Sequence, residues 1–235
     1  MNKDFTEEFY RIFDLYKSNE SFLWGKAADG ELLAIENQEV NNGEFYNDGS
    51  VPQERRDELL KSIQYKHSNF YLGVICPCCC NRDGRSERMK DLSGQDSEHL
   101  SYANLFVNGN YSLYKEYFLK SYSNYDVHLV CHESSKIENL PFTPEKVYPI
   151  SRNAWINNYN LIKRLQDESI EGKLILLAAG PFGNILGHQL FQSHSNNRIL
   201  DIGSTLNPWL QSEGFRRDYY TCSESGFGAR KCVWN

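Results

Sequence analysis

The stretch that decides the fold is Leu174-Ile175-Leu176-Leu177-Ala178-Ala179-Gly180-Pro181-Phe182-Gly183-Asn184. Its first six residues are apolar, which predicts a strand buried on both faces. Gly180 permits a tight turn, and Pro181 suits the first position of a helix, where its missing N–H costs nothing. A helix over 181–191 would then present free N–H groups to a phosphate at the strand end. A tight turn without any ligand is the alternative interpretation.

Strand and helix patterns alternate on both sides of this stretch. Strands are predicted over 70–75, 103–107, 126–131, 147–150 and 198–202, and helices over 6–18, 29–37, 52–65, 111–122 and 155–165. Residues 81–99 are predicted to form a surface loop with at most one short helix. Strands joined by helices imply right-handed crossovers. The predicted fold class is therefore a Rossmann-like α/β domain over residues 1–235, with a mostly parallel sheet and helices on both faces.

Composition narrows the class of protein. Hydrophobic residues make up 40% of the chain and charged residues 24%, as in an ordinary globular protein. The net charge is −6 and no long basic run occurs, which argues against a nucleic acid polymer as partner but not against a single nucleotide. There is no signal-peptide pattern, and no apolar run approaches the ~20 residues of a membrane span. We therefore expect a cytoplasmic protein without a transmembrane segment.

The cysteines are unevenly distributed. Of seven in the chain, four lie in Cys76-Pro77-Cys78-Cys79-Cys80. In a reducing cytosol, free thiols or metal ligands are expected rather than disulfides. Adjacent cysteines cannot all reach one tetrahedral zinc ion, but two of them could do so with Cys222 or Cys232. Inert thiols, a structural metal and a disulfide formed on oxidation all stay open.

A candidate metal site lies near the N-terminus, where Asp29 and Glu31 flank Gly30. In a turn or extended segment, this spacing would aim both carboxylates the same way, with Cα atoms roughly 6.5 Å apart. Carboxylate oxygens suit one divalent cation, and Gly30 lets a ligand approach the backbone closely. The alternative is that Asp29 caps a helix and Glu31 lies in its first turn, where acids are favoured.

Other candidates follow the predicted strands, because ligands of parallel sheets bind beyond the carboxyl ends of the strands. An acid after the strand over 198–202 suits a ribose or a base edge, and an arginine near the C-terminus suits a diphosphate. His132 is a candidate general base. The candidate nucleotide-binding residues are Gly30, Asn153, Gly180, Pro181, Asn184, Asp201, Gly203, Ser204 and Arg217.

Three of these stretches occur in an order that resembles the GT-D fold glycosyltransferases. They are Asp29-Gly30-Glu31, the strand and turn over 174–181, and Leu200-Asp201-Ile202-Gly203-Ser204. The family carries an Arg/Lys-x-Gly-Asp-Gly-Glu motif, a leucine-rich strand ending in Gly-Pro, and an Asp-Ile-Gly segment. Arg152-Asn153-Ala154-Trp155 and Arg217-x-Tyr219 are also similar to this group, so the resemblance covers nearly the whole chain. Ala28 stands where the motif has its first glycine.

The resemblance implies a nucleotide-sugar donor, with a UDP-sugar expected, and Mn²⁺ or Mg²⁺ held by Asp29 and Glu31 as the catalytic and metal-binding residues. Lys26 stands where the family has Arg or Lys, and would contact the donor. The expected activity is transfer of a hexosyl or similar group to a hydroxyl of a glycan, glycoprotein or glycolipid.

Two other classes of protein stay open. The segment Leu200-Asp201-Ile202-Gly203-Ser204 also resembles the start of an S-adenosylmethionine-dependent methyltransferase, although few residues follow it here. The second alternative is a non-enzymatic binding module that is stapled by a metal through its cysteines.

Overall fold

The fold is built on one parallel sheet, seen in a computed structural model that describes residues 4–41, 45–80, 82–168, 170–211, 220 and 231–233. Its strands are β1 (Phe22–Ala27), β4 (Phe70–Val74), β5 (Leu100–Tyr102), β6 (Val127–His132), β7 (Lys146–Ile150), β8 (Leu174–Leu177) and β9 (Arg198–Asp201). Their order is β5-β4-β1-β9-β8-β6-β7, and every neighbouring pair is parallel. Short strands β2 (Val40–Asn41) and β3 (Tyr46–Asn47) form a separate antiparallel pair.

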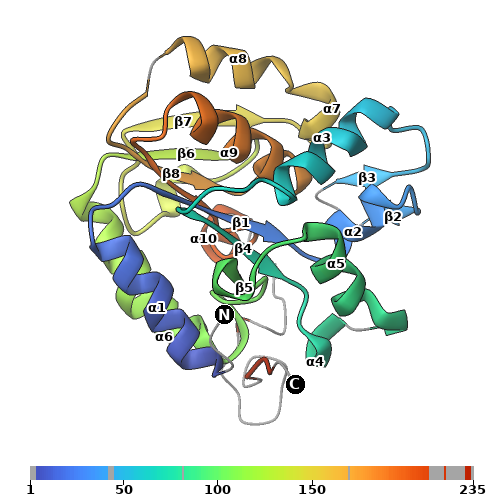
Figure 1. Cartoon of the computed structure of the whole chain (residues 1–235). Helices are drawn as coiled ribbons and strands as arrows, with labels where there is room; N and C mark the ends of the chain where they lie inside the picture. Colours follow the sequence, from blue (N-terminus) through green and yellow to red (C-terminus); the bar gives the residue numbers. More distant parts are fainter. Residues whose placement is uncertain are drawn as a thin grey trace.

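Helices cover both faces of the sheet (Figure 1). They are α1 (Phe5–Lys17), α2 (Asp29–Ile35), α3 (Gln53–Ile63), α4 (Pro77–Cys80), α5 (Arg85–Ser93), α6 (Tyr111–Tyr114), α7 (Ala154–Asn157), α8 (Asn160–Asp167), α9 (Pro181–Ser193) and α10 (Asn207–Leu210). Helices α2, α3, α5 and α7 to α9 pack on one face, while α1, α6 and α10 pack on the other. The predicted α/β class, with helices on both faces of a parallel sheet, is confirmed.

Side chains of the central strands alternate between two hydrophobic clusters. In β1, Leu23 and Ala27 point to the cluster under α9, whereas Phe22 and Trp24 point to the cluster under α1. Successive strand residues face opposite sides of a sheet, so a strand covered on both faces must be apolar at every position. The four residues of β8 meet this condition and are all buried.

The strand β1 was not predicted, because Gly25 and Lys26 interrupt its apolar pattern. Two further predictions were wrong in position. The short strand expected over 103–107 lies instead at β5, and the helix expected over 155–165 is divided into α7 and α8. The division falls at Asn158, whose side chain accepts hydrogen bonds from the backbone N–H (2.9 Å) and the hydroxyl (2.8 Å) of Ser151.

In the segment predicted as a surface loop with at most one short helix, over 81–99, the structure has one nine-residue helix, α5. Gly84 and Gly94 flank this helix, and both have positive φ angles of 70° and 57°. Glycine adopts that conformation without a steric penalty, so it serves well at helix ends. The two glycines that suggested a loop are therefore the boundaries of a helix.

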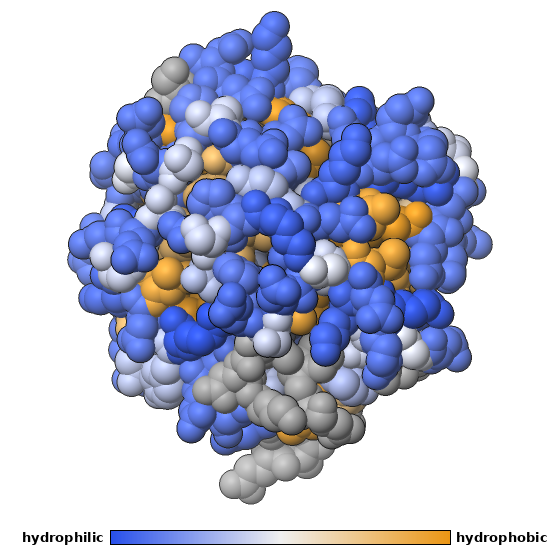
Figure 2. Space-filling view, in the orientation of Figure 1, coloured by the Kyte–Doolittle hydropathy of each residue, from blue (hydrophilic) through white to orange (hydrophobic). Residues whose placement is uncertain are grey.

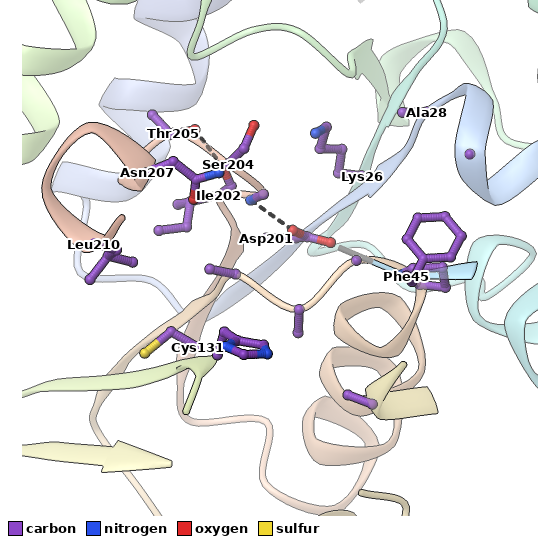
Figure 3. Close-up of a pocket in the computed structure, with 18 of the residues that line it drawn as sticks. Lys26, Ala28, Phe45, Cys131, Asp201, Ile202, Ser204, Thr205, Asn207 and Leu210 are labelled. Atoms are coloured by element: carbon purple, nitrogen blue, oxygen red, sulfur yellow. Dashed lines mark hydrogen bonds between the residues drawn. The ribbon is translucent and has the colours of Figure 1, made fainter. Parts of the chain in front are cut away.

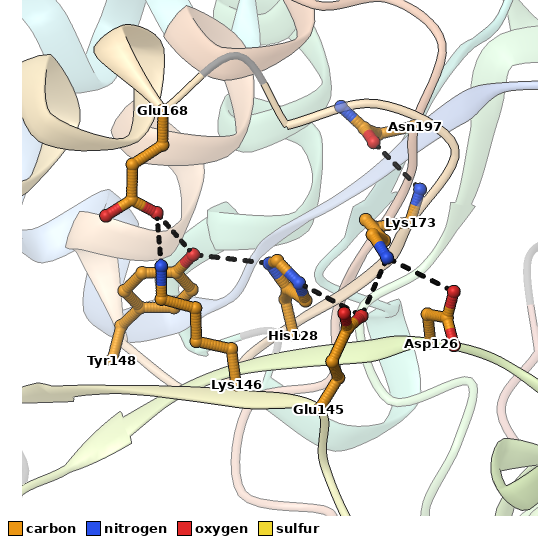
Figure 4. A network of polar contacts seen from close by, with 8 residues as sticks. All are labelled: Asp126, His128, Glu145, Lys146, Tyr148, Glu168, Lys173 and Asn197. Atoms are coloured by element: carbon orange, nitrogen blue, oxygen red, sulfur yellow. Dashed lines mark hydrogen bonds and ion pairs between the residues drawn. The ribbon is translucent and has the colours of Figure 1, made fainter.

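A polar network joins the amino ends of β6 and β7 (Figure 4). The Tyr148 hydroxyl donates to Glu168 (2.8 Å) and contacts His128 Nδ1 (3.2 Å), and Lys146 pairs with Glu168 at 2.8 Å. The hydrogen bond from Lys146 is the main cause that lowers the pKa of Glu168 to about 2. These contacts hold the end of the sheet that lies away from the site described below.

None of the helices in the described part of the chain combines the length and the apolar character that a membrane span requires. The face shown in Figure 2 is mostly hydrophilic, with hydrophobic atoms exposed in a few separate patches.

Candidate functional site

A cavity of about 710 Å³ lies at the carboxyl ends of the strands (Figure 3). Residues that follow β1, β5, β6, β7, β8 and β9 all contribute to its lining. Open parallel sheets bind ligands in a crevice outside the carboxyl ends of their strands. From the end of β1 the chain enters α2 on one face of the sheet, and from the end of the neighbouring strand β9 it leads to α10 on the other face, which leaves a crevice between the two strand ends. The cavity lies over that crevice, and pockets for small ligands measure ~300–1,000 Å³.

Lys26 and Asp201 bring opposite charges into the cavity from two neighbouring strands. Both line it, Lys26 near the end of β1 and Asp201 at the end of β9. Asp201 is only 3% exposed, and its Oδ1 accepts the N–H of Gly203 at 3.0 Å. Gly203 has φ +51°, and a Cβ there would lie 2.6 Å from Lys26 Nζ. The left-handed backbone therefore favours glycine at this position, and any larger residue would also make the end of the Lys26 side chain move.

Asp29 and Glu31 also line the cavity, but from the first turn of a helix. Helix α2 begins at Asp29, with Ala28 in the capping position. The extended conformation considered for the pair does not occur, because helical residues two apart point in directions about 200° apart. Glu31 Oε2 accepts the N–H of Ala28 at 2.9 Å, as in a capping box. The two acids therefore reach the cavity from different sides of the helix end.

Glu31 is an unusual carboxyl group, since it is only 6% exposed. Burial raises its pKa, and the charge of Lys26 and the N–H of Ala28 offset part of that effect. A buried carboxylate is costly unless a cation or hydrogen bonds compensate it. A second cation beside Lys26 would favour the ionised form further.

The donor atoms of Asp29 and Glu31, although they approach from different sides of the helix end, are of the type that magnesium and manganese prefer. Asp29 and Glu31 supply hard carboxylate oxygens at the cavity wall, and Glu31 keeps a second oxygen beyond the one bonded to Ala28. Asp29 and Glu31 do not belong to any group of three or more His, Cys, Asp or Glu residues with neighbouring ligand atoms in the described part of the chain. A cation here would take its remaining ligands from water and substrate phosphates, which is the usual mode of Mg²⁺.

The turn after β8 forms another wall. Gly180 has φ +54° and ψ −142°, a conformation that favours glycine, and Pro181 begins the 13-residue helix α9. Both residues line the cavity, so the amino end of α9 faces it. A helix amino end carries partial positive charge and suits a phosphate.

Two of the predicted nucleotide contacts have structural roles instead. Asn184 and Asn153 are not among the cavity-lining residues. The Asn184 amide donates to the backbone O of Lys26 (2.7 Å) and accepts its N–H (3.2 Å). Asn153 accepts hydrogen bonds from Tyr46 N–H (3.1 Å) and Trp155 Nε1 (2.9 Å).

Of the other predicted residues, Gly30, Gly203 and Ser204 line the cavity. Arg217 and Cys222 lie outside the described residues. His132 also lines the cavity, and its Nδ1 accepts the N–H of Ser134 at 3.1 Å. Nε2 then carries the proton in the neutral ring.

Several wall residues were missed by sequence reasoning. Trp24 lines the cavity from β1, a strand that the sequence pattern did not reveal. Phe45 and Trp155 form an apolar wall, with ring centroids 6.3 Å apart and planes at 78°. Phe45 follows the Asn41-Asn42-Gly43 segment, so no periodic pattern marked it.

The fold and the site together define an α/β protein with a cavity at the carboxyl ends of its parallel strands. No protein-family model and no curated protein matches the sequence. Among solved structures, the chain is similar to the highly conserved domain of unknown function 1792, described as having a distinct glycosyltransferase fold. The TM-score is 0.58 and the identity 16%, over 86% of this chain and 77% of that chain.

A second similar structure is a new glycosyltransferase of the same domain type from Streptococcus sanguinis. Here the TM-score is 0.53 and the identity 16%, over 84% of this chain and 80% of that chain. Identity this low shows the fold alone. The glycosyltransferase fold implied by the sequence resemblance is thereby confirmed.

Proposed function

We propose that the protein is a metal-dependent glycosyltransferase. Its donor would be a nucleotide-diphosphate sugar, with a UDP-sugar expected, and its acceptor a hydroxyl of a glycan, glycoprotein or glycolipid. The observation that carries the proposal is the meeting of two strand ends in one cavity. Lys26, Asp29 and Glu31 come from the end of β1 and the start of α2, while Asp201 and Ser204 come from the end of β9.

Glycosyl transfer breaks the bond between the anomeric carbon and the donor's diphosphate oxygen, and forms a bond to the acceptor oxygen. Negative charge develops on the leaving diphosphate, so fixed positive groups beside it lower the barrier. Lys26 supplies an ammonium group, and the amino end of α9 supplies partial positive charge. Mn²⁺ or Mg²⁺ on Asp29 and Glu31 would add Lewis-acid stabilisation when bound.

The remaining walls suit the neutral parts of a donor. Asp201 offers a carboxylate to a ribose hydroxyl, with one of its oxygens already fixed by Gly203. Phe45 and Trp155 are buried aromatic rings behind this wall and would give the adjoining part of a donor an apolar surrounding. Sugar and nucleotide would thus occupy one continuous cavity.

The test uses Asp29→Asn and Glu31→Gln, which remove charge but little volume. Glutamine can still accept the Ala28 N–H, so the helix cap is kept. We expect each variant to lose about 100-fold or more of the transferase rate, as when a charge-stabilising group is removed. UDP release from UDP-sugars with Mn²⁺ present measures this. Glu39→Gln, an exposed acid beyond α2, is the control and should retain full rate.

Ligand-induced thermal stabilisation supplies a second measurement. UDP with Mn²⁺ should raise the melting temperature of the wild type, and of Glu31→Gln much less. Stabilisation by S-adenosylhomocysteine in place of UDP would contradict the proposal in favour of a methyltransferase. Full transferase rates in both acid variants would also overturn the metal role of these residues.

A further inference from the structure

Three cysteines from two distant parts of the sequence come together near the cavity wall. Cys76 follows β4, Cys78 lies in α4, and Cys232 lies close to the C-terminal end of the chain. Their sulfur atoms all lie within 4.8 Å of one another, and those of Cys76 and Cys78 are 3.4 Å apart. Cys76 and Cys232 are buried, while Cys78 is exposed. Solvent therefore reaches the cluster from the side of Cys78.

The spacing suits a single tetrahedral metal ion. Zinc binds thiolate sulfur at about 2.3 Å, which places two sulfur ligands of a tetrahedron roughly 3.8 Å apart. The sulfur atoms of Cys76 and Cys78 are 3.4 Å apart and no pair among the three exceeds 4.8 Å, so small side-chain shifts would bring all of them to that separation. Thiolates are soft ligands and select zinc over magnesium or manganese, so this cluster would not compete for the cation proposed at Asp29 and Glu31.

Two N–H groups point at the sulfur atoms. Val233 N–H donates to Cys78 Sγ at 3.4 Å, and Asn108 Nδ2 donates to Cys232 Sγ at 3.7 Å. Hydrogen bonds of this kind hold metal ligands in place and disperse the charge of bound thiolates. Asn108 also lines the cavity, so the cysteine cluster and the proposed nucleotide-sugar site share one residue.

We propose that Cys76, Cys78 and Cys232 bind one zinc ion with a structural role. The three thiolates leave one position of the tetrahedron for water or a further ligand. The ion would fasten the residues around Cys232 to the end of β4, next to Asn108 and the cavity wall. Its contribution is to hold together segments that lie far apart in the chain, as structural zinc does in small domains.

The experiment measures zinc in the full-length protein, purified under reducing conditions without chelator or added manganese. We expect about one zinc ion per chain in the wild type. Cys78→Ser is the leading variant, because this side chain is exposed and its replacement should not prevent folding. It should lose most of the zinc, as should Cys76→Ala and Cys232→Ala. Cys131→Ala removes a buried cysteine outside the cluster and should keep the wild-type content.

A second measurement separates binding from folding. A zinc chelator should lower the melting temperature of the wild type and of Cys131→Ala, and leave that of Cys78→Ser unchanged. Cobalt substituted for zinc should give a thiolate-to-cobalt absorption band that Cys78→Ser lacks. No nucleotide takes part in either measurement, so the outcome is independent of the transferase proposal.

Three results would overturn the zinc site. One is a reduced wild-type protein that contains no zinc and takes none up. Another is equal zinc content in Cys78→Ser and the wild type. The third is a wild-type mass lower by two hydrogen atoms that returns to the expected value on reduction, since that mass shows a disulfide.

Discussion

At the scale of single residues, His188 shows how burial couples a side chain to pH. This histidine lies on α9 beside Tyr65, with ring centroids 4.7 Å apart. Burial lowers its pKa from 6.5 to about 4. The unfolded chain therefore binds a proton more readily than the folded one, so stability present above pH 6.5 declines as the pH falls toward 4.

Replacing this side chain should remove that decline. We expect His188→Gln to show a flatter melting temperature between pH 6.5 and 4 than the wild type. The free energy involved is at most about 3 kcal/mol. Scanning calorimetry over that pH range measures it, with His132→Gln, a change at the exposed end of β6, as the control. Equal pH dependence in His188→Gln and the wild type would show that His188 is not the coupled group.

Single residues also explain what the sequence reveals about the site. Asp29, Glu31, Gly180 and Asp201 stand beside recognisable strand or helix signals, and the structure brings all four into one cavity. Phe45 carries no such local signal. Its place is fixed by packing against Trp155, which is a contact between segments that no short-range pattern encodes.

At the scale of elements, Asn184 completes the hydrogen bonding of β1. This strand pairs with β9 only over Phe22–Trp24, so beyond that point β9 leaves its side. The Asn184 amide from α9 then takes both the N–H and the C=O of Lys26. The Asn184 side chain thus makes the hydrogen bonds that β9 would otherwise make to β1, and it holds the backbone of Lys26 in place.

Loss of this amide should destabilise the protein. Asn184→Ala leaves two backbone groups of Lys26 without these partners, and we expect a cost of about 1–3 kcal/mol. Urea unfolding measures the difference. Gln192→Ala, an exposed position on the same helix, should change stability little. A variant at Asn184 as stable as this control would contradict the bridging role.

Elements differ in how well the sequence foretells them. The run over 174–179 is apolar without interruption, so β8 is evident from composition alone. In β1 a glycine and a lysine follow three apolar residues, and the strand is recognised only once β4 and β9 are seen on either side of it. Neighbours in space, rather than local propensity, make this segment a strand.

At the scale of the whole molecule, β9 connects the two parts of the sheet, because it pairs with β1 on one side and with β8 on the other. Among the described residues it is the last strand in sequence, yet it lies between β1 and β8. Without it, the strands β5-β4-β1 and β8-β6-β7 have no direct pairing. The fold therefore depends on a contact between segments far apart in the chain.

A chain that ends at Asn197 should accordingly fail to fold. We expect it to lack a cooperative thermal transition in calorimetry and to aggregate, because both parts of the sheet expose unpaired strand edges. Coexpression of residues 198–235 as a separate chain is the control and should recover the transition. A cooperative transition in the truncated chain alone would show that the parts fold independently.

The central position of β9 also bears on synthesis. Until the ribosome has added β9, the edges of β1 and β8 that pair with it have no strand partner there. Such edges are the surfaces on which nascent chains stick to one another. We therefore expect the protein to need chaperones that bind exposed strand edges during translation, until β9 has been synthesised and pairs with β1 and β8.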